Sequence, residues 1–221
     1  MARLRRLALA GFAHYVIQRG HNGQAAFVDA TDRDSYCSAL FAAAAAEPVQ
    51  LHARAFQACE VQLLVTPDEA GALSRFMQAV NRRYAIAFNR RHGRSGTLWD
   101  GRFRAAVVEP GPLRLLALAL VDTAAPADCT TATQRLGGPR DASLVDPPEY
   151  WALGNTPFER EAAYRALLHA GVPPATAAAM RRAALGNWAA GSLVAVAGQI
   201  GEVERPLAPR PRGRPRQTGR Q

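Results

Sequence analysis

The hydrophobic and polar positions of this chain follow two periods, one typical of strands and the other of helices. Residues 14–19 are mostly apolar and end before a glycine, which predicts a first strand. Residues 50–57 and 60–65 carry apolar side chains at every second position. Because only Ala58 and Cys59 separate these two runs, we expect them to form an antiparallel hairpin.

Two helices are predicted, one before the hairpin and one after it. The first begins at Thr31 and Asp32, whose side chains would cap it, and continues through an alanine run to about Ala46. The second helix has the clearest period, and Gly93 should end it. At 100° per residue its apolar face consists of Leu73, Phe76, Met77, Val80, Tyr84 and Ala87.

Positively charged side chains lie on the opposite face of the second helix. They are Arg75, Arg82, Arg83 and Arg90, joined by Asn89. Residues 98–108 follow as an apolar run with Arg102 and Arg104 at alternate positions, which predicts a strand with one solvent-facing side. These charges have one sign, span two elements and lack a matching acidic stripe. They therefore favour contact with nucleic acid over a merely solvated surface.

The predicted order is strand, helix, strand, strand, helix, strand, which is the order of a ferredoxin-like α+β sandwich, an antiparallel sheet with helices packed on it. An apolar helix at residues 113–121, opened by Pro112, comes next. We expect four regions: an α+β DNA-binding domain at 1–125, an irregular linker at 126–155, a C-terminal helical region at 156–200, and a disordered Arg/Pro/Gly-rich tail at 201–221. The helical region should include helices at 174–185 and 188–197.

Composition supports a polyanionic partner. The chain has 221 residues, a net charge of +9 and a pI near 10.6, and all 27 basic residues are arginine, whose planar fork suits phosphate. Its three cysteines, Cys37, Cys59 and Cys129, are far apart and odd in number, so neither a zinc site nor a disulfide framework is predicted and a reducing cytoplasm is expected. The apolar stretch near the start is too short for export or membrane anchoring.

Residues 73–105, LSRFMQAVNRRYAIAFNRRHGRSGTLWDGRFRA, resemble the matching segment of the REP-associated tyrosine transposases. These are single-strand transposases of the superfamily named after its His-hydrophobic-His motif. Near the start, Arg19 and Gly20 match the family, while His14 and Tyr15 stand in swapped order relative to its Tyr-His pair. The resemblance implies a ferredoxin-like fold and, as ligand, a short DNA hairpin with a single-stranded flank.

The resemblance also implies two metal-binding histidines at positions i and i+2 of the hairpin's second strand, and a tyrosine nucleophile on a later helix. These positions are Glu60, Gln62 and Val121 in this chain, so both histidines and the tyrosine are missing. Oxygen ligands from Glu60 and Gln62 suit Mg²⁺ or Mn²⁺; the alternative is two polar side chains on the solvent-facing side of a hairpin. Tyr84 could act as a replacement nucleophile, but its place on the apolar face favours a core role.

DNA binding does not depend on the missing residues. We expect the contacts to come from Arg19, Arg75, Arg82, Arg83, Arg90, Arg102 and Arg104. Trp99 and Phe103 lie among them and would either stack on unpaired bases or pack in the core. In the tail, Arg212, Gly213 and Arg214 form an AT-hook-like Arg-Gly-Arg-Pro motif suited to an A/T-rich minor groove; a solubilising basic tail is the alternative.

Three hypotheses about function follow. The first is a transposase-family DNA-binding protein, a pseudoenzyme that recognises hairpin or single-stranded DNA without cleaving it. The second is an active, metal-dependent tyrosine transposase with a rebuilt site. The third is a folded remnant without a specific nucleic-acid partner. Whether the chain forms a homodimer stays open.

Overall fold

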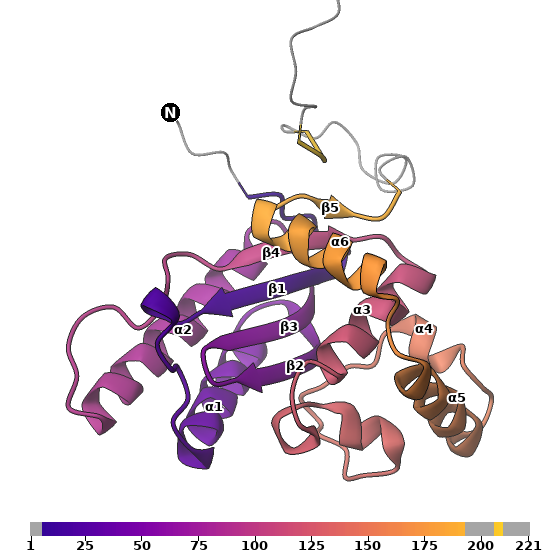
Figure 1. Ribbon diagram of the computed structural model, residues 1–221, viewed down its shortest axis with the longest axis horizontal. Helices are drawn as coiled ribbons and strands as arrows, with labels where there is room; N and C mark the ends of the chain where they lie inside the picture. Colours follow the sequence, from indigo (N-terminus) through magenta and orange to yellow (C-terminus); the bar gives the residue numbers. More distant parts are fainter. Residues whose placement is uncertain (1–5, 193–205, 210–221) are drawn as a thin grey trace, which may run out of the picture.

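The computed structural model describes residues 6–192 and 206–209 (Figure 1). Its sheet has the strand order β2-β3-β1-β4-β5. The strands are β1 (His14–Arg19), β2 (Val49–Gln57), β3 (Glu60–Pro67), β4 (Arg104–Val108) and β5 (Ala189–Ala190). β1 lies between β3 and β4 and pairs antiparallel with both, and β2 and β3 form the expected hairpin. The first four strands thus have the ferredoxin-like order, and the predicted α+β class is confirmed.

Helices cover both faces of this sheet. They are α1 (Ala30–Ala46), α2 (Ala72–Arg91), α3 (Pro112–Asp122), α4 (Pro148–Trp151), α5 (Pro157–Ala170) and α6 (Pro174–Gly186). The side chains of β1 alternate between two cores: Val16 packs with α1 and α2, while Tyr15 and Ile17 pack with α3, α5 and α6. Figure 1 shows α3 and α6 on the near face of the sheet. Neither face of the central strands is therefore open to solvent.

This second helical layer corrects one prediction. Glu60 and Gln62 were expected either to bind metal or to lie on a solvent-facing side of the hairpin. Both residues are only 4% exposed and every residue of β3 is buried, so the solvent-facing alternative is wrong. Alternate side chains of β3 therefore face two different cores, and neither set faces water.

The fourth strand is shorter than predicted. It begins at Arg104, whereas the apolar run begins at Leu98. Gly101 has a φ of +67°, which an extended strand cannot contain. Trp99 precedes this turn and makes only an isolated bridge with Gly20.

Two helix boundaries show how local chemistry sets the ends. Asp29, and not Thr31 or Asp32, caps α1: its Oδ1 accepts a hydrogen bond from the backbone N–H of Asp32 at 3.1 Å. α2 ends at Arg91, and Gly93 follows with a φ of +60°, as predicted.

The helix predicted at residues 188–197 is wrong at its start. Asn187, with a φ of +55°, ends α6, and the chain then pairs with β4 as β5. Residues 193–197 lie outside the described part, as does most of the predicted tail.

Residues 126–155 are irregular and contain two short 3-10 helices, Ala127–Cys129 and Ala132–Leu136, before α4. They nevertheless pack closely on the domain through Arg135, whose side chain is fully buried. Its guanidinium donates to Asp146 at 2.7 Å, to Asp122 at 2.9 Å and to the carbonyl of His52. The hydroxyl of Tyr164 on α5 donates to the same Asp122 at 2.7 Å. One buried arginine thus joins α3, α5, β2 and the irregular segment.

The two edges of the sheet also have neighbours. β5 pairs parallel with β4, with Ala189 opposite Val107. On the β2 edge, Ala55 bridges to Thr130, and the N–H of Val145 donates to the carbonyl of Leu51 at 2.8 Å. In the described part of the chain, none of the helices combines the length and the hydropathy needed to cross a membrane.

Candidate nucleic-acid interface

The long amphipathic helix α2 forms one wall of the candidate site. Its predicted apolar stripe is buried in the first core, with Phe88 completing it and Ala87 half-buried. The hydroxyl of Tyr84 donates to the carbonyl of Ala26 at 2.5 Å, and burial raises the pKa of this tyrosine well above its usual value. Tyr84 is therefore a core residue and not a nucleophile.

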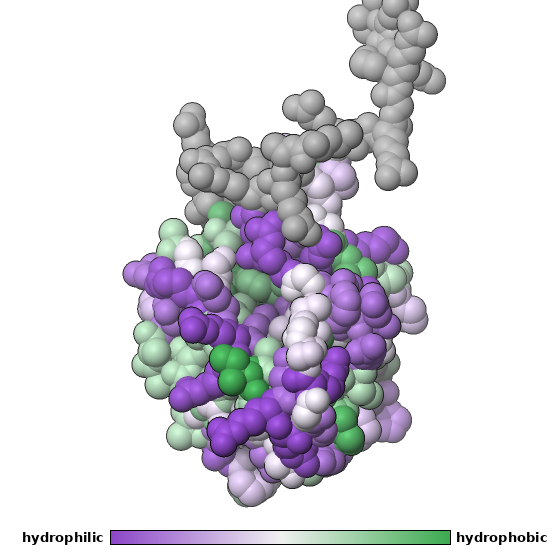
Figure 2. All heavy atoms as spheres, turned by 90° about the vertical axis from the view of Figure 1, so that its left-hand side faces the viewer, coloured by the Kyte–Doolittle hydropathy of each residue, from purple (hydrophilic) through white to green (hydrophobic). Residues whose placement is uncertain are grey.

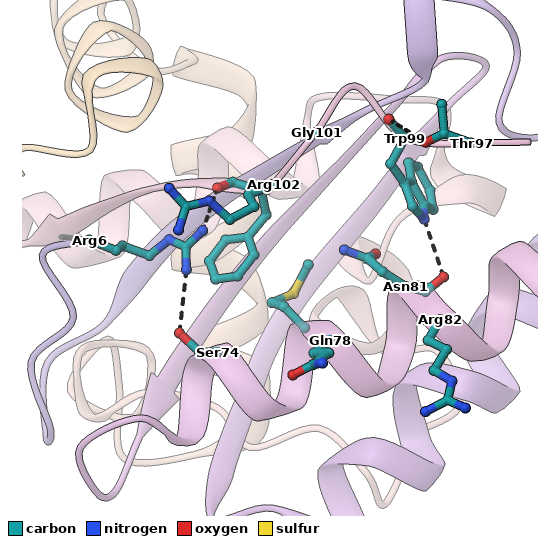
Figure 3. A pocket seen from close by; sticks show the side chains of 11 residues that line it. Arg6, Ser74, Gln78, Asn81, Arg82, Thr97, Trp99, Gly101 and Arg102 are labelled. Atoms are coloured by element: carbon teal, nitrogen blue, oxygen red, sulfur yellow. Dashed lines mark hydrogen bonds between the residues drawn. The ribbon is translucent and has the colours of Figure 1, made fainter. Parts of the chain in front are cut away.

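A cavity of about 620 Å³ lies between α2 and residues 97–103 (Figure 3). Its apolar lining comes from Met77, Trp99 and Phe103. The indole N–H of Trp99 donates to the backbone carbonyl of Asn81 at 3.4 Å, which fixes the loop against the helix. The N–H of Asp100 donates to the carbonyl of Arg19 at 2.8 Å and joins the same loop to β1. The cavity thus has fixed walls on both sides.

A polar stripe of α2 forms the rest of the wall. Ser74, Gln78 and Asn81 are three or four residues apart, so they lie one above another on the helix, next to its buried stripe. Figure 3 shows them along the helix below the loop that carries Thr97 and Gly101. The sequence shows this stripe as polar residues beside the apolar positions of the helix. Because these residues are uncharged, a search for charged residues does not find them.

Arginines surround the opening of the cavity. Arg6, Arg82 and Arg102 line it, and Arg6 was not predicted. The guanidinium of Arg6 lies 3.5 Å from the centre of the Phe103 ring and donates to the Phe103 carbonyl at 3.0 Å and to Ser74 at 3.3 Å. Burial, followed by the charges of Arg102 and Arg104, lowers the pKa of Arg6 to about 10. The guanidiniums are therefore close enough to repel one another, and an anion bound among them would relieve this repulsion.

Most of the predicted arginines have no partner among the residues that the structure describes. Within residues 6–192 and 206–209, no ion pair or hydrogen bond engages the guanidinium of any of five exposed arginines, Arg82, Arg83, Arg90, Arg102 and Arg104. Figure 2 shows the side of the molecule that carries α2, where hydrophilic side chains cover much of the surface and hydrophobic ones show between them. A surface of this kind is available to phosphate groups.

Two of the predicted arginines differ from the rest. Arg75 pairs with Glu47 at 2.7 Å and also with Glu69, so the expected absence of acidic partners is wrong at this position. Arg19 donates to Glu60 at 3.0 Å. The tail residues Arg212, Gly213 and Arg214 lie outside the described residues.

Glu60 and Gln62 lie together on β3, but other side chains already engage their polar atoms. Arg181 of α6 donates to both carboxylate oxygens of Glu60, at 2.8 and 2.7 Å. The amide of Gln62 donates to Glu60 at 2.9 Å, and its oxygen accepts from the hydroxyl of Tyr15 at 2.7 Å. Burial opposes ionisation of Glu60, yet the hydrogen bonds from Arg181 and Arg19 outweigh it and hold the pKa of this carboxyl below its usual value.

These contacts do not fit a divalent metal ion. The guanidinium of Arg181 occupies the position from which a cation would have to approach Glu60. Val121 is buried in the core between the sheet and α3, α5 and α6. In the part of the chain that the structure describes, histidine, cysteine, aspartate and glutamate side chains form no group of three that could hold a metal. Arg181 could not be assigned to this site from the sequence, because it lies 121 residues from Glu60.

Among known proteins, this chain is similar only to solved structures. No protein-family model and no curated protein matches this chain. A solved REP-associated tyrosine transposase bound to a REP hairpin is similar at 13% identity and a TM-score of 0.47, covering 55% of this chain and 70% of that one. A presumed transposase from Deinococcus radiodurans is similar at 20% identity and a TM-score of 0.36, covering 50% and 88%. At these values the similarity carries no argument about function.

Proposed function

We propose that this chain is a transposase-family DNA-binding protein that recognises hairpin or single-stranded DNA and does not cleave it. The observation that carries the proposal is the group of arginines around the cavity beside α2. Arg82 and Arg102 line it without an acidic partner among the described residues, and Arg6 adds a third charge. Arg104 is close enough to help lower the pKa of Arg6. The resemblance of residues 73–105 to the transposase segment supplies the class of DNA.

The arginines bind phosphate by charge and by their planar donors. Each phosphate that an arginine neutralises releases condensed counterions, so affinity falls with salt, by a slope of about 0.7 per contact for single strands. Arg83 and Arg90, on the exposed surface of α2, extend this positive surface beyond the cavity. The AT-hook-like residues of the tail, Arg212 to Arg214, would add a separate duplex contact.

Glu60 and Val121, at the metal and nucleophile positions of the family, are the reason why no cleavage is expected. Phosphotransfer in this family needs a metal ion and a tyrosine hydroxyl, and Arg181 already neutralises the carboxylate at the metal position. Valine has no nucleophilic atom. The proposal therefore separates binding of DNA from its chemistry.

A gel-shift assay with a hairpin oligonucleotide that carries a 5′ single-stranded flank tests both parts. With Mg²⁺ or Mn²⁺ present, we expect a salt-sensitive shift and no adduct that survives denaturation. A covalent protein–DNA adduct would establish an active transposase with a rebuilt site. Lack of any shift, with hairpin and single strand alike, would leave only the folded remnant.

A further inference from the structure

The cavity beside α2 has features that phosphate binding alone does not require. It combines an apolar lining, a polar stripe and positive charge at the opening. We propose that this cavity receives one unpaired nucleobase of the bound DNA strand, preferring a base with an exocyclic amine. This inference rests on the proposed function and names the part of the ligand that enters the protein.

The size of the cavity suits this ligand. At about 620 Å³ it lies within the usual range for small-molecule sites, roughly 300–1,000 Å³. A base inside a duplex has both faces stacked and its edge paired, so only an unpaired or displaced base could enter. Arg82 and Arg102 at the opening would hold the phosphates on either side of that base.

The lining offers flat and apolar contact to a base. Met77 and the rings of Trp99 and Phe103 form the apolar side, and both rings are largely buried. The Arg6 guanidinium, lying over the Phe103 ring, presents a second planar group. Bases stack on aromatic rings and on guanidinium planes alike.

Two amides supply hydrogen bonds to the edge of the base. Gln78 is exposed at the cavity and makes no hydrogen bond with another described residue. The amide of Asn81 donates to Gln18 at 3.2 Å, while its Oδ1 is buried without a partner within the described part. Buried polar atoms are normally paired, so an unpaired acceptor in the wall calls for a donor, reached after a small rotation of the Asn81 side chain.

An exocyclic amine is the donor that fits. Cytosine and adenine carry one on the edge that side-chain amides recognise, whereas thymine presents a carbonyl oxygen there. At this exocyclic position, an amide acceptor therefore distinguishes cytosine from thymine, two bases of similar size. This comparison isolates the hydrogen bond from the size of the base.

The test uses the full chain and three single strands of about 12 nucleotides, within the range that such sites span. They are oligo-dC, oligo-dT and an abasic strand with the same phosphates. Fluorescence anisotropy should give the tightest binding for oligo-dC, about fivefold tighter than oligo-dT, as one good base contact implies. The abasic strand should bind at least about tenfold more weakly than oligo-dC, because stacking is lost too.

Two variants make the result specific. Gln78→Ala should reduce the preference for oligo-dC over oligo-dT and leave abasic binding unchanged, because its side chain is exposed and folding does not depend on it. Gln50→Ala, at an exposed residue of β2, is the matched control and should change nothing. Equal affinity for abasic and base-containing strands, or an equal loss for all three with Gln78→Ala, would overturn the inference while sparing the proposed function. Failure to bind any of the three strands would also overturn the inference, and failure to bind the flanked hairpin as well would remove the proposed function.

Discussion

His52 shows how a single buried residue couples this fold to pH. Its ring lies between the Val145 carbonyl, 2.6 Å from Nδ1, and the Thr66 hydroxyl, 2.8 Å from Nε2. A neutral ring satisfies both contacts, with Nδ1 donating to the carbonyl and Nε2 accepting from the hydroxyl. Burial lowers the pKa of His52 to about 4, and it does the same to His14. Both histidines are therefore neutral in the folded protein at pH 7.

This predicts a loss of stability in mild acid. The unfolded chain takes up protons on these histidines near pH 6.5, whereas the folded protein does not until about pH 4. The free energy of unfolding should therefore fall between these values, by up to about 3 kcal/mol for each histidine. Urea titrations at pH 7 and pH 5 measure the difference. Equal stability at both pH values would show that neither histidine has a lowered pKa in the folded protein.

At the scale of single elements, α2 and the loop after it provide the positive surface. Arg82 lies on the helix and Arg102 on the loop, on opposite walls of one cavity. Two consecutive segments of the chain thus place positive charge on both sides of one cavity. Binding should depend on both walls and not on the total charge of the protein.

We predict that the double variant Arg82→Ala/Arg102→Ala weakens binding to the flanked hairpin about tenfold at low salt. The slope of affinity against salt should fall by about 1.4, which is 0.7 for each lost phosphate contact. Arg182→Ala, an exposed position on α6, removes the same kind of charge away from the cavity and should have little effect. If Arg182→Ala weakens binding as much as a single cavity variant does, the interaction is a general attraction to a basic protein.

The sequence predicts individual helices and strands better than it predicts which other elements pack on them. The period of α2 and the alternation of β2 and β3 are local, so the hairpin and the long helix follow from nearby residues. The burial of Glu60 is not local, because α6 lies more than a hundred positions away and brings Arg181 to it. Likewise, a run of apolar residues predicts a strand from Leu98, but the positive φ of Gly101 interrupts it. Arginines are visible in the sequence, whereas the cavity they surround depends on tertiary contacts.

At the scale of the whole molecule, Arg135 connects the sheet, α3 and the irregular segment before α4 through side-chain contacts. It contacts Asp122 at the end of α3, Asp146 before α4 and the backbone of β2. Arg135, Asp122 and Asp146 are all buried, and the arginine neutralises both carboxylates, with the exposed Arg140 as a further partner of Asp146. The irregular segment therefore belongs to the same folding unit as the sheet.

Arg135→Ala should reduce the free energy of unfolding by about 3–5 kcal/mol, because it leaves the buried carboxylate of Asp122 without a cation and that of Asp146 with only the exposed Arg140. Arg140→Ala removes a half-exposed partner of the same Asp146 and should cost less than about 1 kcal/mol. Chemical denaturation of the three proteins measures both values. A small effect of Arg135→Ala would mean that water or a shifted side chain replaces the guanidinium.

The neighbours at both edges of the sheet also bear on self-association. Exposed backbone at a terminal strand is the usual starting point for fibrils and for dimers built by continuing a sheet. Here Thr130 and Val145 engage β2, and the two residues of β5 engage β4. A second copy of the described part therefore finds few unpaired peptide groups to extend. Contacts between copies are expected through helices and loops, and the folded protein should resist amyloid-like assembly at high concentration.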